Sequence, residues 1–179
     1  MKSLTTYLND RKLISVRRQD IDDHVIQGFV VGISSELVAL EYVYDFQIDG
    51  LMVLRRSDIS EIKRTGTDEF QETLLKREGI QPGSQGPIPS DLISWRSVIQ
   101  ELSAQYPLMI LERELGPSPR FAIGRPTAIS QAQVEFLTFS GTARWSEKAN
   151  RFKYSQISSL QVNTRYVNFY DRHFRRGAA

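Results

Sequence analysis

The sequence predicts a mainly β protein with short helices, built as two tandem five-stranded β-barrels joined by a Pro/Gly linker and a helix. Two observations carry this fold class. Ten short runs rich in β-branched and aromatic residues alternate with turn signals, which is typical of antiparallel β structure. Residues 78–91, which hold three prolines and three glycines, divide these runs into two sets of five.

The two sets of predicted strands correspond to each other. The first set is LISVRR, VIQGFVVGIS, LVALEYVYD, GLMVLRR and ISEIKR, and the second is LMILERE, FAIGRPTAIS, QVEFLTFSG, RFKYSQIS and LQVNTRYVNFY. Ile33-Ser34 recurs as Ile129-Ser130, and the motif SDISEI recurs 98 residues later as SQISSL. This spacing indicates a weak internal repeat. We expect Gly28 to lie at a strand bend.

Two helices flank the linker in the prediction. The first spans residues 67–78, with Thr67 as N-cap, acidic residues in its first turn, basic residues in its last turn and Gly79 as its stop. The second begins at the cap Ser90 and carries one apolar stripe that includes Trp95. We interpret that stripe as a packing face.

The linker also sets the predicted domain boundaries and separates two kinds of charge. We expect an N-terminal barrel with a short helix over 1–79, a linker over 80–89, and a helix with a second barrel over 90–179. Residues 1–89 hold 11 Lys and Arg against 14 Asp and Glu, whereas the rest hold 12 against 7. The basic second half suits nucleic acid or an acidic protein, and it equally suits a solvated surface.

The first half resembles the Sm-like family, in particular its bacterial Hfq branch, within the SH3-like barrels. The resemblance rests on VIQGFVVGISSELVALEYV and on RRSDISEI, and it covers mainly residues 13–64. It implies a five-stranded barrel with a strongly bent hairpin. We expect the hairpin turn that follows to lie at Asp49-Gly50, where glycine permits a positive φ.

The same resemblance implies RNA binding through an aromatic-Lys-His triplet before the closing Ile-Ser step. The equivalent positions here are Arg55, Arg56 and Ser57 in the first repeat and Lys153, Tyr154 and Ser155 in the second. Neither triplet is kept. The resemblance therefore implies the architecture and not the pore chemistry, because fold alone does not determine function.

The C-terminal tail, residues 163–176, interleaves arginines with aromatic residues. Such a composition suits single-stranded nucleic acid, because arginine binds phosphate and aromatic rings stack on bases. The candidate nucleic-acid-binding residues are Arg165, Tyr166, Arg172, Arg175 and Arg176. The alternative is an edge strand in which Tyr166 and Tyr170 pack inward and the arginines keep the edge soluble. A further candidate basic patch is Arg17, Arg18, Arg55 and Arg56.

Little in the sequence supports catalysis or a bound cofactor. The chain has no cysteine and two histidines, and it contains none of the common catalytic or phosphate-binding motifs. The cluster DIDDH, Asp20 to His24, lacks the ligand spacing of a calcium loop, and a charged turn explains it. We expect no enzyme activity, no cofactor and no metal site.

These observations leave two function classes. The first is a non-catalytic protein-interaction module, acting as adaptor, inhibitor or self-assembling unit, whose strand edges pair with another chain or with copies of itself. The alternative is an RNA-binding Sm-like protein that uses its basic C-terminal half. No run of apolar residues is long enough to span a membrane, so we expect a cytoplasmic protein without membrane contact.

Overall fold

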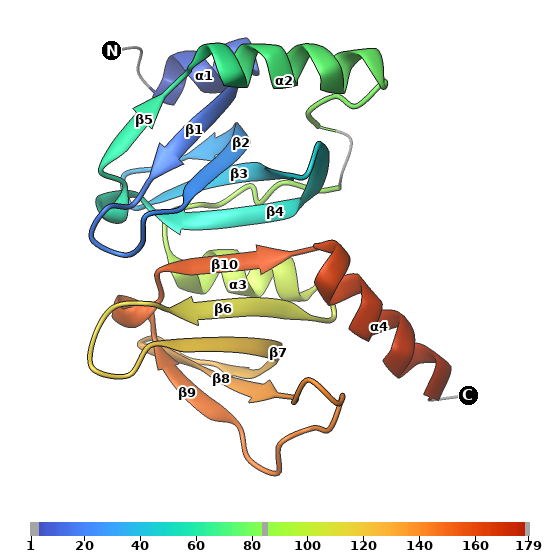
Figure 1. The fold of residues 1–179 in the computed structure, drawn as a ribbon. Coiled ribbons are helices and arrows are strands. Elements are labelled where there is room, and N and C mark those ends of the chain that lie inside the picture. The colour runs from blue at the N-terminus through green and yellow to red at the C-terminus, as the bar shows by residue number, and fades with distance from the viewer. Residues whose placement is uncertain (1–3, 84–85, 178–179) are drawn as a thin grey trace.

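The computed structural model describes residues 4–83 and 86–177. Within these residues ten antiparallel strands form one open sheet (Figure 1). The strands are β1 (Leu13–Arg17), β2 (Val25–Ile33), β3 (Leu37–Tyr44), β4 (Gln47–Arg55), β5 (Glu61–Lys63), β6 (Met109–Arg113), β7 (Arg120–Ile129), β8 (Gln133–Thr138), β9 (Asn150–Lys153) and β10 (Ser159–Val162). The predicted mainly β class is confirmed.

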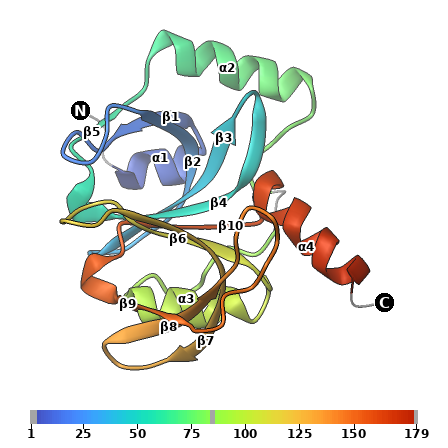
Figure 2. The same ribbon diagram turned by 60° about the horizontal axis from the view of Figure 1, so that its bottom comes forward.

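Short helices flank the strands. The α-helices are α1 (Leu4–Asp10), α2 (Gly66–Arg77), α3 (Trp95–Ser103) and α4 (Arg165–Gly177), and the 3-10 turns are η1 (Arg56–Asp58) and η2 (Tyr154–Gln156). In Figure 1 the first half of the chain lies above and the second half below, with α4 projecting at one side. Figure 2 shows α3 among the strands of the second half, between β6 and β8 in that view.

The strand order repeats across the sheet. The first half runs β5-β1-β2-β3-β4 and the second half runs β10-β6-β7-β8-β9, with β4 and β10 paired where the halves meet. The register of this junction pairs Leu54 with Ser159 and Leu51 with Val162. The sheet therefore continues through the junction without a break.

Each half bends its second strand at the same place. The pairing of β2 with β3 shifts between Val30 and Gly32, and the pairing of β7 with β8 shifts between Pro126 and Ala128, which lie 96 residues later. Such bulges bend a strand and increase its twist. Gly28 itself lies before this bulge, in regular pairing with Tyr42, and not at the bend where it was expected. A Cβ atom there would lie 2.7 Å from the Glu41 carbonyl oxygen, so close strand approach requires glycine at this position.

The largest apolar core spans both halves. It surrounds α3, whose Trp95, Val98, Ile99 and Leu102 are buried, as predicted for the apolar stripe. The first half adds side chains of β3 and β4, and the second half adds side chains of β6 to β10. Because α3 packs against strands of both halves, it fastens them together.

The boundaries of the predicted helices shift by one to five residues. The N-cap of α2 is Thr65 and not Thr67, because Thr65 and Asp68 form a reciprocal capping box. The N-cap of α3 is Ser94 and not Ser90, through a similar pairing with Ser97. The helix α1 was not predicted from the sequence.

The predicted hairpin turn at Asp49-Gly50 is wrong. The turn lies at Asp45 and Phe46, both at positive φ, which is the geometry of a tight hairpin turn. Gly50 lies inside β4 with a φ of +79°, and a Cβ there would meet the Val162 carbonyl oxygen across the junction. Glycine at this position lets β4 approach β10.

The expectation of a long last strand is also wrong. The strand β10 ends at Val162, since Asn163 adopts a φ of +57° and the Thr164 hydroxyl accepts a hydrogen bond from the Val167 amide. The following residues form α4, whose buried face contains Val167 and whose Tyr170 and Phe174 pack against the core. Apolar residues spaced three or four apart favour a helix, and this period was missed.

Candidate functional site

The junction between β4 and β10 is the candidate functional region, because it shows how one repeat recognises the other. The Arg55 amide of β4 donates to the Ser158 carbonyl at 3.2 Å. The Arg55 Nη2 atom donates to the carbonyls of Tyr154 and Ile157 at 2.7 and 2.6 Å, and its guanidinium lies 5.9 Å from the centre of the Trp95 ring. A strand edge and a partly buried cation thus hold the two repeats together.

Arg18 forms a second link between the repeats. Its Nη1 and Nη2 atoms donate to the two carboxylate oxygens of Glu114 at 2.6 and 2.9 Å, and Asp22 lies 3.5 Å from Nη2. Arg18 is 4 % exposed. A bidentate pair of this kind fixes geometry as well as charge, so it sets the position of the first repeat against the second.

A partly buried carboxyl group, that of Glu112, lies beside this link. Burial raises the pKa of Glu112, a hydrogen bond from Ser159 opposes the rise, and the nearby charge of Glu114 adds to it. The Ser159 hydroxyl and the Gln161 side-chain amide both donate to the Glu112 Oε2 atom. These donors lie on β10 and their acceptor on β6, so the group joins neighbouring strands of the second repeat.

The hydrogen bonds of the two repeats match atom for atom at their closing strands. The Ser60 amide donates to the Arg17 carbonyl at 2.9 Å, and the Ser158 amide donates to the Glu112 carbonyl at the same distance. The hydroxyl groups of these two serines reach the same two carbonyls at 3.1 Å. The repeat predicted from SDISEI and SQISSL is therefore present in the backbone geometry.

The sheet ends in two strands that have one neighbour each. They are β5, which pairs with β1, and β9, which pairs with β8. In the repeat β5 corresponds to β10 and β9 corresponds to β4. The two outer edges of the described sheet are thus the counterparts of the two edges that pair at the junction.

The four arginines of the predicted basic patch each contact a group of the protein itself. Arg18 and Arg55 make the links described above, Arg17 lies 3.4 Å from Glu61, and Arg56 donates to the Ser34 carbonyl at 2.8 Å. Arg18 is buried, whereas Arg17 and Arg55 are partly buried and Arg56 is exposed. The structure distributes these residues over internal contacts.

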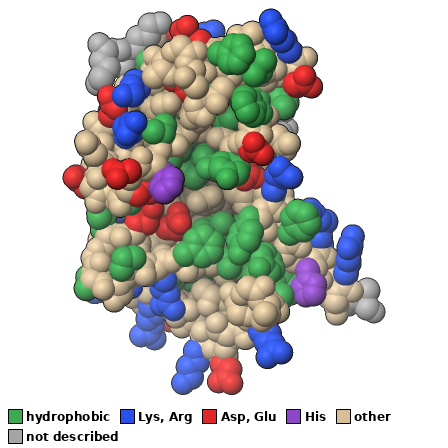
Figure 3. Space-filling view, viewed as in Figure 1, with side chains coloured by type: hydrophobic (Ala, Val, Ile, Leu, Met, Phe, Trp, Pro, Cys, Tyr) green, Lys and Arg blue, Asp and Glu red, His purple; other side chains and the backbone are tan. Residues whose placement is uncertain are grey.

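The residues of the predicted nucleic-acid site all lie on α4. The Arg165 amide donates to Asp49 at 2.6 Å, and the Tyr166 ring lies 6.4 Å from the Phe121 ring. Arg172 lies over the Phe169 ring at 4.5 Å, Arg175 pairs with Asp171, and Arg176 is exposed near the end of the helix. Figure 3, viewed from the same side as Figure 1, shows hydrophobic side chains gathered around the middle of the molecule.

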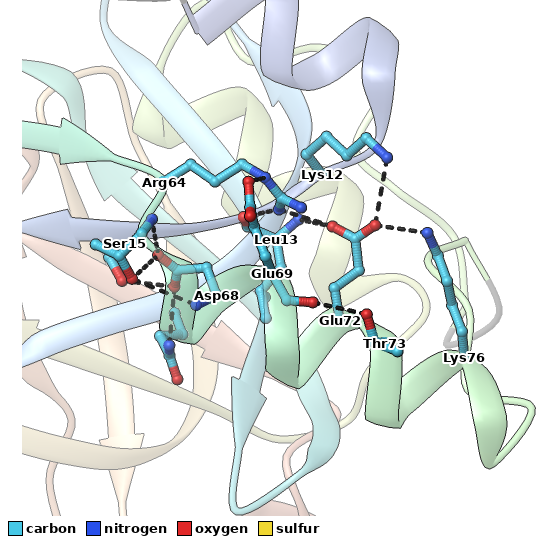
Figure 4. A network of polar contacts seen from close by, with 11 residues as sticks. Lys12, Leu13, Ser15, Arg64, Asp68, Glu69, Glu72, Thr73 and Lys76 are labelled. Carbon is cyan, nitrogen blue, oxygen red and sulfur yellow. Dashed lines mark hydrogen bonds and ion pairs between the residues drawn. The ribbon is translucent and has the colours of Figure 1, made fainter.

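A third polar cluster fixes α2 on the first repeat (Figure 4). Asp68, fully buried, accepts hydrogen bonds from Ser15 and Gln27, and Glu72 accepts from the Leu13 amide at 3.1 Å and from Arg64 at 2.7 Å. Lys12 and Lys76 complete the group around Glu72, with which they form ion pairs of 3.4 and 2.5 Å. Every contact is internal, so the cluster is structural.

Burial opposes ionisation of Glu72, but its hydrogen-bond donors outweigh that effect. The Lys76 ammonium, the Leu13 amide and the Arg64 guanidinium all favour the carboxylate, and they lower its pKa from 4.5 to about 2. Neither this cluster nor the Arg18–Glu114 pair was predicted from the sequence. Leu13 and Glu72 are 59 residues apart in the chain, and Arg18 and Glu114 are 96 residues apart, so no local pattern connects them.

The chain matches no family model, and neither a curated protein nor a solved structure resembles it significantly. Residues 4–83 and 86–177 contain no group of three or more His, Asp or Glu side chains placed to hold a metal ion. None of the helices in this part of the chain is long and apolar enough to cross a membrane.

Proposed function

We propose that this protein is a non-catalytic, self-assembling interaction module built from two tandem Sm-like barrels. The observation that carries the proposal is the pairing of β4 with β10, in which the fourth strand of one repeat binds the fifth strand of the other. The outer strands β9 and β5 are the remaining fourth and fifth strands. Copies of the chain then associate head to tail, with β9 of one copy paired to β5 of the next.

The backbone of β9 supports this pairing. The Tyr154 amide donates inward to the Ala132 carbonyl of the β8 side, and the Arg56 amide donates in the same way to Glu36. Because successive amides alternate in direction along a strand, the Lys153 and Arg151 amides point away from β8. Lys153 is the counterpart of Arg55, whose amide forms the junction hydrogen bond.

A single proline tests the proposed edge. Arg151→Pro removes an outward amide of β9 while leaving the amides that pair with β8, so the variant should stay folded and lose association. Arg151→Ala is the matched control, since it removes the same side chain and its 3.3 Å contact with Glu135 but keeps the amide. Sedimentation and native mass spectrometry should give multiples of the 20.5 kDa chain for the wild type and the control.

The opposite edge gives an independent check. The Ile62→Pro variant in β5 should also be a folded monomer of 20.5 kDa, whereas the Ile62→Ala variant should still associate. Circular dichroism reports whether each variant is folded. A wild-type chain that stays monomeric at about 100 μM, within the range of ordinary association equilibria, would refute self-assembly. Folded proline variants that still associate would exclude these two edges.

RNA binding by α4 remains the alternative prediction. Its support is weaker because the rings of Tyr166 and Tyr170 pack edge to face, with centroids 5.3 Å apart, and Tyr170 also packs against Phe139 at 4.8 Å, so these rings are already engaged within the protein. If RNA binds, its affinity should fall steeply with salt and with replacement of Arg172, Arg175 and Arg176 by alanine.

A further inference from the structure

The linker of this protein lies along the bent second strand of the first repeat. Pro82, Gly83 and Ile88 enclose a hollow of about 130 Å³ together with α1 and with Val30 and Val31 of β2. The Gly83 amide also donates to the buried Glu41 carboxylate at 2.6 Å. Pro82, Gly83 and Ile88 therefore cover the space between α1 and β2.

The same segment continues along β2 to its end. The Ser34 hydroxyl donates to the Leu92 carbonyl at 2.7 Å. At Gly32 a Cβ atom would lie 2.5 Å from the Leu92 side chain, so the chain just after the linker packs directly on the strand. The first repeat thus has a surface along β2 for a peptide segment, and residues of its own chain before α3 cover it.

The second repeat has the corresponding surface, and no segment among the described residues covers it in this way. A groove of about 540 Å³ lies between α3 and β7, and its lining includes Pro126, Thr127 and Ala128, the counterparts of Val30, Val31 and Gly32. The equivalence follows from the bulge that both strands have at this point. Among the described residues, all of the lining comes from α3, from Pro107 and from β7.

Two further positions show that the described residues leave this groove uncovered. Ala128, the counterpart of the tightly packed Gly32, is exposed. Ser130, the counterpart of Ser34, is also exposed, and its hydroxyl donates to the Gln133 carbonyl inside its own turn. The contacts that Gly32 and Ser34 make with Leu92 thus have no equivalent among the described residues of the second repeat.

The charge of the groove selects its occupant. Its charged lining residues are Arg96 and Arg125, and no acidic side chain is among the lining. The buried Arg96 Nε atom has no hydrogen-bond partner among the described residues. We propose that the groove between α3 and β7 binds an extended, acidic, proline-containing segment of a partner protein. This site is separate from the β5 and β9 edges, so it does not depend on self-assembly.

The test uses the full chain and a labelled 14-residue peptide with the sequence EGIQPGSQGPIPSD, which is acidic and rich in proline. Fluorescence anisotropy measures its affinity, and NMR amide shifts show where it lies. We expect shifts at residues 100–103 and 127–129. A peptide with lysine in place of its Glu and Asp should bind at least about tenfold more weakly, which is about 1.4 kcal/mol.

Variants of the groove complete the test. Arg96→Glu with Arg125→Glu should weaken binding at least about tenfold, a loss of about 1.4 kcal/mol. Arg77→Glu with Arg144→Glu is the matched control, because it makes the same charge change at exposed positions outside the groove. Ala128→Trp should block the groove without changing charge, which covers the case in which the double reversal fails to fold.

Several results would overturn this assignment. They are equal binding of both peptides, undiminished binding to a folded groove variant, amide shifts confined to residues 30–34, and no binding at about 1 mM peptide, a weak limit for specific recognition. The sedimentation of the groove variants separates this question from self-assembly. Their assembly mass should equal that of the wild type.

Discussion

Single charged side chains fasten the elements of this protein to one another. Glu72 is the clearest example, since its side chain is 4 % exposed and contacts α2, β1 and the segment that follows β5. A carboxylate held by so many donors is stabilised in its ionised form only in the folded state. Its lowered pKa of about 2, against 4.5 for an ordinary glutamate, is therefore a source of stability.

The first prediction concerns Glu72→Gln. The stabilisation from a lowered acid pKa is complete above the unfolded value of 4.5 and is lost as the pH falls towards 2. The variant should lose about 2–3 kcal/mol of unfolding free energy at pH 7, and the difference from the wild type should be smaller at pH 3. Urea unfolding at both pH values measures this.

Glu69→Gln is the control for this experiment, because Glu69 is on the same helix and its side chain is 65 % exposed. It should change the unfolding free energy by less than about 0.5 kcal/mol at either pH. A Glu72→Gln variant that is as stable as the wild type at pH 7 would show that the cluster in Figure 4 does not stabilise α2.

At the scale of elements, local sequence patterns predicted strands more reliably than turns and ends. Apolar and β-branched runs identified all five strands of each half, although the last run continued beyond the end of β10 at Val162. The turn was predicted at Asp49-Gly50 because an Asp-Gly pair is a common hairpin signal. The chain turns instead at Asp45 and Phe46, which both adopt positive φ values. Tertiary contact with Val162 explains the glycine, and no local pattern contains that information.

The second prediction concerns Gly50→Ala in β4. Alanine would have to adopt a φ of +79° and place its Cβ against the Val162 carbonyl. The backbone strain alone costs about 1–3 kcal/mol, and the clash should also push β4 away from β10. Thermal unfolding should show a clear decrease in the midpoint for this variant.

Gly141→Ala gives the matched comparison, because a Cβ at Gly141 meets nothing within 4 Å. Its midpoint should stay close to that of the wild type. Equal stability of the two variants would mean that the approach of β4 to β10 does not require glycine at position 50.

At the scale of the whole molecule, the repeat in the sequence explains the repeated strand order but not the way the halves join. The offsets of 96 and 98 residues were visible in Ile33-Ser34 and in SDISEI. The pairing of β4 with β10 and the shared core around α3 depend on surfaces far apart in the chain. A single sequence does not show which surfaces meet.

The third prediction follows from that shared core. Because Leu37, Ala39, Leu51 and Val53 of the first repeat pack in one cluster with α3 and the second repeat, the chain should unfold in one cooperative step. Calorimetry should give a van't Hoff enthalpy equal to the calorimetric enthalpy, about 125 kcal/mol near 60 °C for 179 residues. The Arg151→Pro variant, expected to be monomeric, removes the complication of assembly.

Two independent barrels would behave differently in the same measurement. Each would unfold with about half of that enthalpy, so the van't Hoff value would be about half of the calorimetric value. Arg18→Met separates the two models further, since it removes the bidentate contact with Glu114 across the junction. In a cooperative molecule it lowers the single midpoint, whereas in a molecule of independent barrels it leaves the second repeat's transition where it was.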